Sequence, residues 1–429
     1  MEIAKLHSLF LNSQGVCTDT RNIHKESIYF ALKGARFNGN DFALQALEQG
    51  ASFAVVEDFT LEHPQLIQVK DVLKTLQELA AYHRRSLGIP IVAITGSNGK
   101  TTTKELIKTV LEKKYQLIAT EGNFNNHIGV PLTLLRMHAK TELGIVEMGA
   151  NHPGEIADLC EITQPNWGYI TNFGKAHLEG FGSLEGVIEA KSELYRYLIH
   201  HQGKIVVNAE DEIQLKKTKE AQTFRFGKQK DVDLQWVDRS EGLSICFVCN
   251  GVAYHSTLYG LYNIHNILAA IALGHIFEVP LAAIQTAVAS YVPSNNRSQV
   301  LQKEDVTLIL DAYNANPSSM QHAIASFAQK ASSKSIILLG AMLELGQHEE
   351  KEHKNLVEKC LKRNLGRLIL VGSGFEKTAR DTPLIEYYPN TETLLKEFIP
   401  PLEKPDYILI KGSRRWALER AITLFGFEV

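Results

Sequence analysis

The sequence contains little cysteine. Its 429 residues include five cysteines, and only Cys246 and Cys249 lie close together, as a C-x-x-C pair. A small secreted domain held by disulfides has more cysteines at closer spacing, and a zinc site needs a second pair that this sequence lacks. Residues 243–249 have the composition of a buried strand. We therefore expect structural thiols rather than metal or redox chemistry, and a cytoplasmic protein.

Long apolar runs and an excess of charge of one sign are also missing. No run reaches the ~20 apolar residues of a membrane-spanning helix, and the first residues do not have the pattern of a secretory signal. The 45 basic and 48 acidic residues are interleaved and give a formal net charge of −3. We therefore expect neither insertion into a membrane nor a surface that binds nucleic acid.

What the sequence does have is an alternating α/β pattern, over a length sufficient for two to four domains. Residues 1–87 alternate short strands and helices. Residues 88–294 have the pattern of a doubly wound domain, with an antiparallel extension over 223–255. After a linker at 292–296, residues 295–429 have the pattern of a smaller Rossmann-like α/β domain. The fold class expected is α/β, with three domains at these boundaries.

One segment, Ile91–Thr103, has the layout of a phosphate-binding loop. Five residues typical of a buried strand precede the turn Gly96–Gly99, and Lys100 then opens a helical pattern. Glycines let backbone N–H groups approach phosphate oxygens, Lys100 supplies positive charge, and the Thr101 hydroxyl can ligate Mg²⁺. Ile94 occupies the first glycine position of G-x-x-x-x-G-K-[ST], so the loop is short, and an ordinary turn with a surface lysine is the alternative. The predicted phosphate-binding residues are Gly96, Ser97, Asn98, Gly99, Lys100, Thr101 and Thr102.

Polar residues follow the next strands expected in this domain. Glu147 ends the strand expected over 143–148, and His177 lies in a glycine-flanked loop after the strand expected over 167–171. Ligands bind at the carboxyl ends of strands in such sheets. Glu147 is therefore a candidate to ligate Mg²⁺ opposite Thr101 or to activate water, and His177 is a candidate metal ligand or acid/base group. A half-buried surface glutamate and a structural histidine are the alternatives.

Lys191 lies where an apolar residue is expected. Ser183 has the character of a helix N-cap, and the helix after it places Lys191 in the middle of an apolar stripe. A buried ammonium is costly unless it forms an ion pair, reaches solvent or changes chemically. A lysine whose pKa is lowered beside Mg²⁺ can add carbon dioxide and become a negatively charged carbamate that bridges metals. Carbamylation and a structural ion pair are the two interpretations. The stripe consists of Leu184, Val187, Ile188, Leu194, Tyr195 and Leu198.

These motifs resemble those of the Mur ligases, which add amino acids to the peptidoglycan precursor. The short loop Thr95–Thr103 and the blocks Glu147–Ile156, Thr171–Gly182 and Ala190–Tyr195 match the family in order. The resemblance extends over essentially the whole chain. It implies an N-terminal domain that binds a uridine-linked substrate, a central ATPase domain and a C-terminal ligase domain that binds the acceptor.

The resemblance also implies roles for the residues of the central domain. Thr101 and Glu147 would be Mg²⁺ ligands, His177 would bind a second Mg²⁺, and Lys191 would be the carbamylated lysine. Together with Lys100, the last three form the implied catalytic set. The family reaction needs no covalent enzyme nucleophile, and none is evident in the sequence.

Other blocks imply contacts to nucleotide and substrate. Residues 260–270 resemble the family motif G-x-H-N-x-x-N-A, in which an asparagine contacts adenine, although Tyr262 replaces the histidine. Arg297 corresponds to an arginine that reaches the γ-phosphate of ATP. For the loop 121–131, capping asparagines are the alternative to substrate binding. The implied adenine residues are Asn263 and Asn266, and the implied uridine-substrate residues are Thr20, Arg21, Asn125 and Asn126.

The block Asp311–Pro317, Asp-Ala-Tyr-Asn-Ala-Asn-Pro, is the most specific signature. It resembles family members that add D-alanyl-D-alanine to UDP-N-acetylmuramoyl-tripeptide, whereas other members have different residues after the aspartate. Ala341 stands where the family has an aspartate, so the function of that carboxylate is absent or supplied elsewhere. Asp311 would contact nucleotide, and the implied acceptor-side residues are Asn314, Asn316, Lys411, Ser413 and Arg414.

The implied reaction is ATP-dependent amide-bond formation. The tripeptide carboxylate attacks the γ-phosphate of ATP, and the dipeptide amine then attacks the acyl phosphate and releases phosphate. ATP and two Mg²⁺ are the implied cofactors, and we expect a monomer that closes its domains around the substrates. The alternatives are a related ligase such as folylpolyglutamate synthase or the ligase adding the third amino acid, a phosphotransferase using the same loop, and a non-catalytic nucleotide-binding module.

Overall fold

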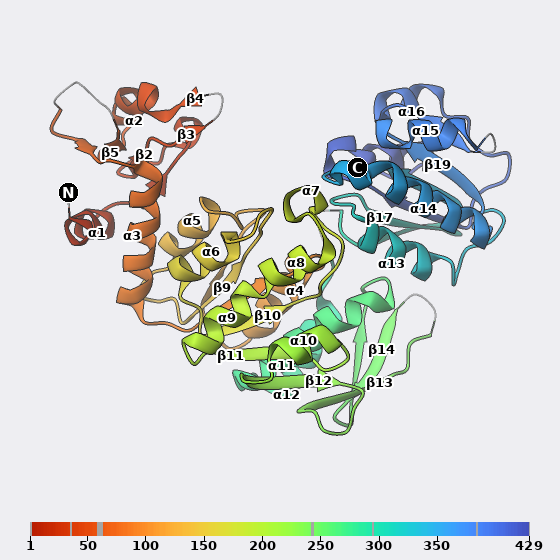
Figure 1. The fold of residues 1–429 in the computed structure, drawn as a ribbon, viewed down its shortest axis with the longest axis horizontal. Helices are drawn as coiled ribbons and strands as arrows, with labels where there is room; N and C mark the ends of the chain where they lie inside the picture. Colours follow the sequence, from red (N-terminus) through yellow and green to blue (C-terminus); the bar gives the residue numbers. More distant parts are fainter. Residues whose placement is uncertain are drawn as a thin grey trace.

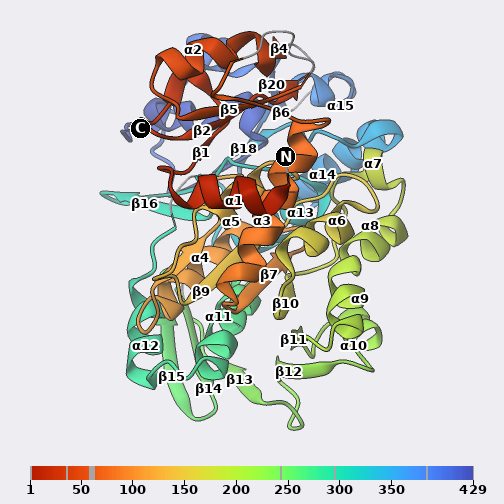
Figure 2. The same ribbon diagram turned by 90° about the vertical axis from the view of Figure 1, so that its left-hand side faces the viewer.

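The structure, a computed structural model, describes residues 2–34, 37–57, 63–241, 244–293, 296–382 and 385–428. These residues form three α/β domains, each built on a sheet of its own, and Figure 1 shows the central domain between the other two. In the orthogonal view of Figure 2 the N-terminal and C-terminal domains both lie above the central one. The α/β class and the three-domain architecture expected from the sequence are confirmed.

The N-terminal domain is a small parallel sheet with three helices. Its described elements are α1 (Ile3–Leu11), β1 (Val16–Cys17), β2 (Ile28–Phe30), β3 (Lys33–Gly34), β4 (Phe37–Asn38), α2 (Ala43–Glu48), β5 (Phe53–Val56), β6 (Leu66–Gln68) and α3 (Val72–Leu87). The sheet order is β1-β2-β5-β6, all parallel. The composition of residues 27–33 and 51–56 indicated β2 and β5. It did not indicate β1 and β6, because two or three residues are too few to show an alternation.

Helix α3 fixes the N-terminal domain to the central one. The side chain of Asp71 caps its first turn by accepting a hydrogen bond from the backbone N–H of Lys74 at 2.8 Å. Near its other end the guanidinium of Arg84, which is 6% exposed, donates to the carbonyl oxygens of Thr163 at 2.9 Å and Gln164 at 3.0 Å. These carbonyls end a helix of the central domain, so charge-assisted hydrogen bonds hold the junction.

Two buried histidines lie at the same junction. Nε2 of His83 is 2.8 Å from the carbonyl oxygen of Met137, and Nδ1 of His83 is 3.0 Å from Nε2 of His7. Because a carbonyl only accepts, His83 donates through Nε2, and its Nδ1 accepts the proton of His7. This pairing requires a neutral His83. Burial is the main cause that lowers the pKa of both histidines, and the repulsion that a second charge at His83 would bring lowers the pKa of His7 further.

We expect the stability of this junction to fall as the pH falls below 6.5, the ordinary pKa of histidine. In that range the unfolded histidines bind protons that the folded histidines do not, so acid favours the unfolded state. Thermal unfolding between about pH 8 and about pH 5 measures the effect. His83→Gln has no titrating group at this position and should show a weaker pH dependence than the wild type. Equal pH dependence in the two proteins would contradict the expectation.

The central domain is a large sheet covered by helices. Its described elements are β7 (Ile91–Thr95), α4 (Lys100–Leu111), β8 (Leu117–Ala119), α5 (Gly129–Leu135), β9 (Leu143–Glu147), α6 (Glu155–Thr163), β10 (Trp167–Ile170), α7 (Leu178–Phe181), α8 (Leu184–Lys191), α9 (Glu193–His200), β11 (Lys204–Asn208), α10 (Glu212–Lys217), β12 (Gln222–Gly227), β13 (Leu234–Asp238), β14 (Ile245–Cys249), β15 (Val252–Ser256), α11 (Ile264–Ile276) and α12 (Leu281–Ser290). The sheet order is β15-β14-β13-β12-β11-β10-β7-β9-β8. All five residues of β7 are buried, which explains why its sequence is continuously apolar up to Thr95.

The extension expected over 223–255 is antiparallel only in part. β14 runs antiparallel to β13 and β15, as expected. β12 is parallel to β11, and β13 is parallel to β12. Helix α10 supplies the crossover that a parallel β11–β12 pair requires, and the sequence analysis did not predict that short helix.

The helix expected after Ser183 is interrupted. The Ser183 hydroxyl accepts from the backbone N–H of Gly186 at 3.1 Å, so the predicted N-cap is confirmed. The apolar stripe, however, is divided between α8 and α9, which meet at Ser192. After the break, the carboxylate of Glu193 accepts from the backbone N–H groups of Gly154 at 2.8 Å and Ala157 at 2.9 Å. This carboxylate accepts hydrogen bonds from backbone N–H groups that have no partner within α6, because they lie at its N-terminus.

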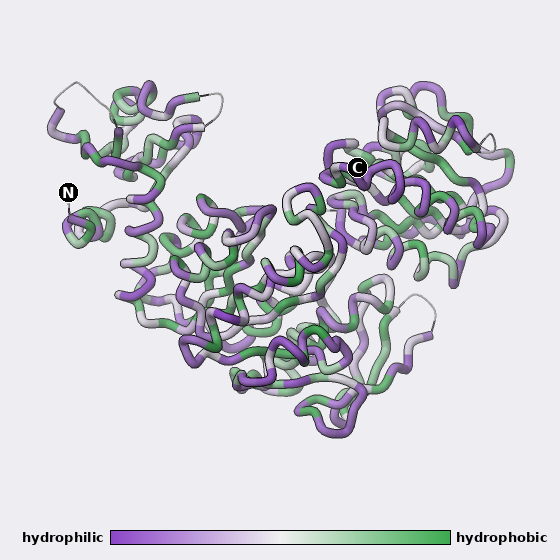
Figure 3. The backbone as a smooth tube through the Cα atoms, in the orientation of Figure 1, coloured by the Kyte–Doolittle hydropathy of each residue, from purple (hydrophilic) through white to green (hydrophobic). Residues whose placement is uncertain are grey.

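The C-terminal domain is a second doubly wound sheet. Its described elements are β16 (Gln299–Lys303), β17 (Val306–Asp311), α13 (Pro317–Phe327), β18 (Ile336–Gly340), α14 (Glu349–Arg363), β19 (Arg367–Val371), α15 (Glu376–Arg380), β20 (Glu386–Tyr388), α16 (Thr391–Glu397) and β21 (Tyr407–Lys411). The order is β16-β17-β21-β18-β19-β20, parallel except for β16 against β17. Figure 3 shows hydrophobic residues along the strands and hydrophilic residues on the outer loops.

Three further observations bear on the sequence analysis. Cys246 and Cys249 are free thiols in β14, and Cys249 is buried. No helix of the described residues is long and apolar enough to cross a membrane. Leu243 of the expected strand, and residues 294–295 of the expected linker, lie outside the described residues.

Candidate nucleotide-binding and ligase site

A cavity of about 1390 Å³ lies between the central and C-terminal domains. The glycine loop Gly96–Gly99 lines one side of it, with Glu147 and His177 from neighbouring strand ends. Arg297, Asp311 and Lys411 line it from the C-terminal domain. The carboxyl ends of strands from two sheets thus meet at one cavity, as expected for ligand sites of doubly wound folds.

Hydrogen bonds join the two domains beside the glycine loop. The Asn316 amide donates to Oδ1 of Asn98 at 2.7 Å. The backbone N–H of Lys175 donates to the hydroxyl of Ser318 at 2.9 Å, and its ammonium lies 2.7 Å from the carboxylate of Glu352. The C-terminal domain therefore contacts the glycine loop directly. The side chain of Asn316, predicted to lie on the acceptor side, makes this contact.

The glycine loop is held by residues that follow β10. A Cβ on Gly96, where φ is 137°, would lie 2.0 Å from the hydroxyl oxygen of Thr171, so only glycine fits. The Thr171 hydroxyl donates to the carbonyl oxygen of Asn98 at 2.6 Å. The Ser97 hydroxyl donates to the carbonyl oxygen of Gly174 and accepts from the backbone N–H of the same residue. The ammonium of Lys100 donates to the carbonyl oxygen of Gly96 at 2.8 Å. Burial lowers the pKa of Lys100, and the nearby carboxylate of Glu147 partly offsets this effect.

Glu147 has the surroundings of a metal ligand. It is 1% exposed, and its Oε1 accepts from Asn125 at 2.8 Å and from the Thr101 hydroxyl at 3.3 Å. Its Oε2 is buried and has no hydrogen-bond partner among the described residues. An unpartnered buried carboxylate oxygen is costly, and a hard cation beside Thr101 would satisfy it. No set of three or more His, Cys, Asp or Glu in the described part of the chain could hold an ion alone.

Lys191 is buried, as its position in the apolar stripe predicted. Its side chain is 1% exposed, and the ammonium donates to the carbonyl oxygen of Ala150 at 3.1 Å. The ring centroid of Phe181 lies 5.2 Å away. No carboxylate forms an ion pair with Lys191 among the described residues. Burial, and after it the positive charge of Lys100, lowers the pKa of Lys191 to about 7. The structural ion pair weighed from the sequence is therefore absent from the described residues.

His177 contacts the C-terminal domain. It adopts a left-handed conformation, with φ 51°, at the start of α7, and Nδ1 of its ring contacts the carboxylate of Glu344. The hydrogen bond from His177 is the main cause that lowers the pKa of Glu344. The backbone carbonyl of Glu344 also accepts from Glu179 at 3.2 Å. Ala341, where the family has an aspartate, is buried, whereas Glu344 three residues later brings a carboxylate to the cavity.

The two asparagines predicted to contact adenine form a hydrogen bond with each other. The Asn266 amide donates to Oδ1 of Asn263 at 2.8 Å, and Oδ1 of Asn266 accepts from the Thr103 hydroxyl at 3.0 Å. The Asn263 amide donates to the carbonyl oxygen of Tyr259 at 2.8 Å. Both asparagines line the cavity, and a Cβ on Gly99 would lie 2.8 Å from Oδ1 of Asn266. Asn266 therefore packs against the glycine loop, and adenine contact by either residue stays a prediction.

Sequence reasoning missed a second polar cluster in the same cavity. Glu210, just after β11, accepts from the Trp236 indole at 2.8 Å and lies 3.2 Å from Nε2 of His265. The ammonium of Lys228 lies 4.5 Å from the centroid of a Trp236 ring. The polar residues that follow the apolar strand over 204–207 could have indicated this cluster, because polar residues at strand ends were already expected to bind ligands.

The remaining predicted substrate residues are dispersed. Thr20 and Arg21 lie in the N-terminal domain, where Arg21 forms an exposed ion pair with Asp19. Oδ1 of Asn126 accepts from the backbone N–H of Gly129 at 2.9 Å, which is the capping alternative weighed from the sequence. Asn314 lines the cavity, and its Oδ1 accepts a hydrogen bond from the backbone N–H of Ala315. Ser413 and Arg414 follow β21, and Lys411 ends that strand in an ion pair with Asp311 at 2.6 Å.

Family models match three consecutive segments of the chain. The Mur ligase family catalytic domain matches residues 12–84, the Mur ligase middle domain matches residues 94–274, and the Mur ligase glutamate ligase domain matches residues 296–414. The chain belongs to the Mur ligase family. The resemblance inferred from its motifs is thereby confirmed, and this Mur ligase is an ATP-dependent ligase.

Individual Mur ligases are similar over nearly the whole length. UDP-N-acetylmuramoyl-tripeptide–D-alanyl-D-alanine ligase of Bacillus subtilis (strain 168) is 34% identical over 427 residues, which cover 95% of this chain and 92% of that protein. A crystal structure of MurF from Acinetobacter baumannii is 28% identical with a TM-score of 0.87, covering 97% of each chain. MurF from Thermotoga maritima in complex with ADP is 26% identical with a TM-score of 0.84, again covering 97% of each chain.

Proposed function

We propose that this Mur ligase joins D-alanyl-D-alanine to UDP-N-acetylmuramoyl-tripeptide. A carboxylate oxygen of the tripeptide attacks the γ-phosphorus of ATP, and ADP leaves. The dipeptide amine then attacks the acyl carbon, the amide forms, and phosphate leaves. The observation that carries this proposal is the cavity in which the phosphate loop faces the block Asp311–Pro317 of the C-terminal domain. Relatives named for this reaction, covered over nearly their full length, support the choice of substrates.

Lys100 and Arg297 line the cavity from opposite domains and would bind the phosphates of ATP. Both are cations, and charge builds on the transferred phosphoryl group as the reaction proceeds. The interdomain contacts beside Asn98 bring the two domains together on this side of the cavity, which would limit the access of water to the acyl phosphate. Thr20, Arg21, Asn125 and Asn126 stay predictions as contacts to the uridine-linked substrate.

Mg²⁺ fits the residues present. Thr101 and Glu147 would hold one ion, and His177 would hold the second after release from Glu344. Bound there, the ions would neutralise phosphate oxygens that the protein side chains alone do not neutralise. A lysine with a pKa near 7 is partly neutral at pH 7, so the Lys191 nitrogen can attack carbon dioxide and lose a proton to water. The resulting carbamate would be an anionic ligand. A cytoplasmic location and a monomeric state stay predictions.

The test is phosphate release from ATP and Mg²⁺ with the uridine-linked tripeptide, with and without D-alanyl-D-alanine. We expect release that needs both substrates, with one pentapeptide product formed per phosphate. Lys100→Met is the matched control and should lower kcat by about 10²–10³. A stable phosphorylated product would instead indicate a phosphotransferase. Release that depends on glutamate or another amine would contradict the proposed acceptor.

A further inference from the structure

Arg297 lies against an aromatic ring of the C-terminal domain. Its guanidinium carbon is 3.6 Å from the ring centroid of Tyr313, so the cation lies over the ring face. Arg297 lines the cavity, and its Nε is buried without a hydrogen-bond partner among the described residues. The guanidinium is thus positioned by the ring and the backbone rather than by a carboxylate. Its charge remains available to an anionic ligand.

Tyr313 also carries a second guanidinium. Arg414 lies 5.4 Å from the same ring centroid, and its backbone N–H donates to the carbonyl oxygen of Tyr313 at 3.1 Å. Two like charges repel, and the negative faces of an aromatic ring reduce the cost of holding them close together. Tyr313 belongs to the block Asp311–Pro317, but the sequence analysis gave it no role.

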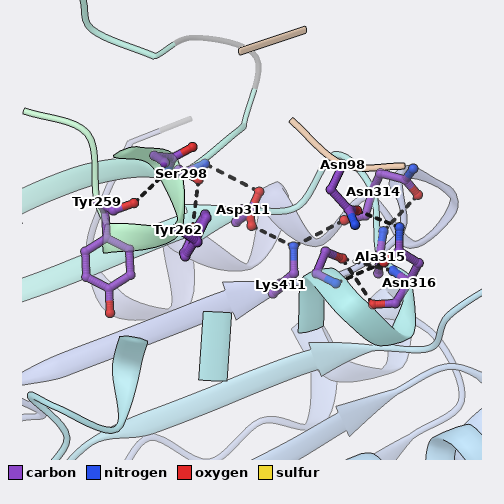
Figure 4. A network of polar contacts seen from close by, with 11 residues as sticks. Asn98, Tyr259, Tyr262, Ser298, Asp311, Asn314, Ala315, Asn316 and Lys411 are labelled. Atoms are coloured by element: carbon purple, nitrogen blue, oxygen red, sulfur yellow. Dashed lines mark hydrogen bonds and ion pairs between the residues drawn. The ribbon is translucent and has the colours of Figure 1, made fainter. Parts of the chain in front are cut away.

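The residue next to Arg297 is held from two domains, as Figure 4 shows. Ser298 has a left-handed backbone, with φ 48°, and is 7% exposed. Its hydroxyl lies 3.0 Å from the hydroxyl of Tyr262 in the central domain. Its backbone N–H donates to Oδ1 of Asp311 at 3.4 Å, and Lys411 holds the other oxygen of Asp311 at 2.6 Å. The backbone at Arg297 is therefore determined, and the ring of Tyr313 fixes the direction of its side chain.

We propose that Tyr313 is a positioning residue, whose ring face holds the Arg297 guanidinium ready for the terminal phosphate of ATP. This inference rests on the proposed function, in which Arg297 reaches the γ-phosphate. A planar guanidinium held on a ring loses less orientational freedom when it binds an anion than a free one. Because ADP lacks the γ-phosphate, the effect of Tyr313 appears in ATP affinity and not in ADP affinity.

The test compares Tyr313→Leu with Tyr313→Phe by calorimetric titration of ATP and of ADP in Mg²⁺ buffer without tripeptide. Tyr313→Leu removes the aromatic face and should weaken ATP binding about 5- to 10-fold, with ADP binding unchanged. Tyr313→Phe keeps the face and should bind both nucleotides as the wild type does. Unchanged ADP binding also shows that the variant is folded. Equal weakening of ATP and ADP by Tyr313→Leu would overturn the proposal.

A double-mutant cycle with Arg297→Ala separates positioning from a general structural effect. In the Arg297→Ala background, Tyr313→Leu should change ATP affinity by less than about 2-fold, because the group that it positions is gone. Additive losses would overturn the proposal, and so would an Arg297→Ala variant with an unchanged ATP-to-ADP preference. None of these titrations uses D-alanyl-D-alanine. Failure of the ligase reaction itself therefore appears separately, in the product assay.

Discussion

Lys191→Ala should lower ligase kcat by about 10²–10³, and added acetate should restore part of the activity. Lys191 itself does not line the cavity, but its side chain is 1% exposed and its ammonium donates to the carbonyl oxygen of Ala150, which does, so truncation leaves a small void next to that residue. If the working form of the lysine is a carbamate, the lost function is a negative charge. A small carboxylate that enters the cavity supplies that charge, whereas it does not replace an ammonium.

The measurement is phosphate release at a series of acetate concentrations, with chloride as the ionic-strength control. Lys104→Ala is the matched variant, because Lys104 is also a buried lysine, 4% exposed, on α4. Any activity that Lys104→Ala loses should not respond to acetate. Rescue of Lys191→Ala by methylamine and not by acetate would show that the working group is the ammonium, and it would contradict carbamylation.

Lys411→Met should destabilise the C-terminal domain by about 3–5 kcal/mol. Lys411 is 2% exposed and holds Asp311 at 2.6 Å, and it also donates to the carbonyl oxygen of Asn314 at 3.3 Å. Methionine nearly preserves the volume but leaves the carboxylate of Asp311 without its partner in a largely buried place. Hydrogen exchange of the amides in β17 and β21 measures the local loss.

Lys404→Met is the control for Lys411→Met in the same domain. Lys404 also forms an ion pair, with Glu304, but both side chains are more than half exposed. An exposed pair is screened by water and salt, so exchange in β17 and β21 should not change measurably. If the two substitutions changed hydrogen exchange in β17 and β21 equally, the buried Asp311–Lys411 pair would stabilise the domain no more than an exposed pair, which would contradict the prediction.

The glycine loop between strand and helix, and the strand-end carboxylate, could be predicted because their signals are local. A buried strand, a glycine turn and a Lys-Thr helix start lie within Ile91–Thr103, and Glu147 immediately ends an apolar strand. Lys191 was identifiable for a related reason, since a lysine within an apolar stripe contradicts the helical pattern around it. In each of these cases, the residues that carry the signal are close together in the sequence.

The partners of these residues could not be predicted in the same way. The hydrogen bonds of Asn266 with Thr103 join residues far apart in the chain, as do those of Asn98 with Asn316. The interruption at Ser192 likewise depends on Glu193 finding the N-terminus of α6. Short segments such as β1 and β6 become strands only because a neighbouring strand satisfies their backbone groups.

The sequence by itself determined that this protein is a three-domain α/β Mur ligase with a glycine loop between a buried strand and a helix, a strand-end carboxylate and a buried lysine. Local periodicity and turn chemistry are sufficient for these conclusions, because they act over a few residues. Only the tertiary structure decided that Lys191 has no carboxylate partner among the described residues, and that Tyr313 carries the guanidinium of Arg297. Such contacts depend on how separate helices, strands and loops of a domain pack together, and the free energies of packing act between surfaces that the order of residues does not reveal.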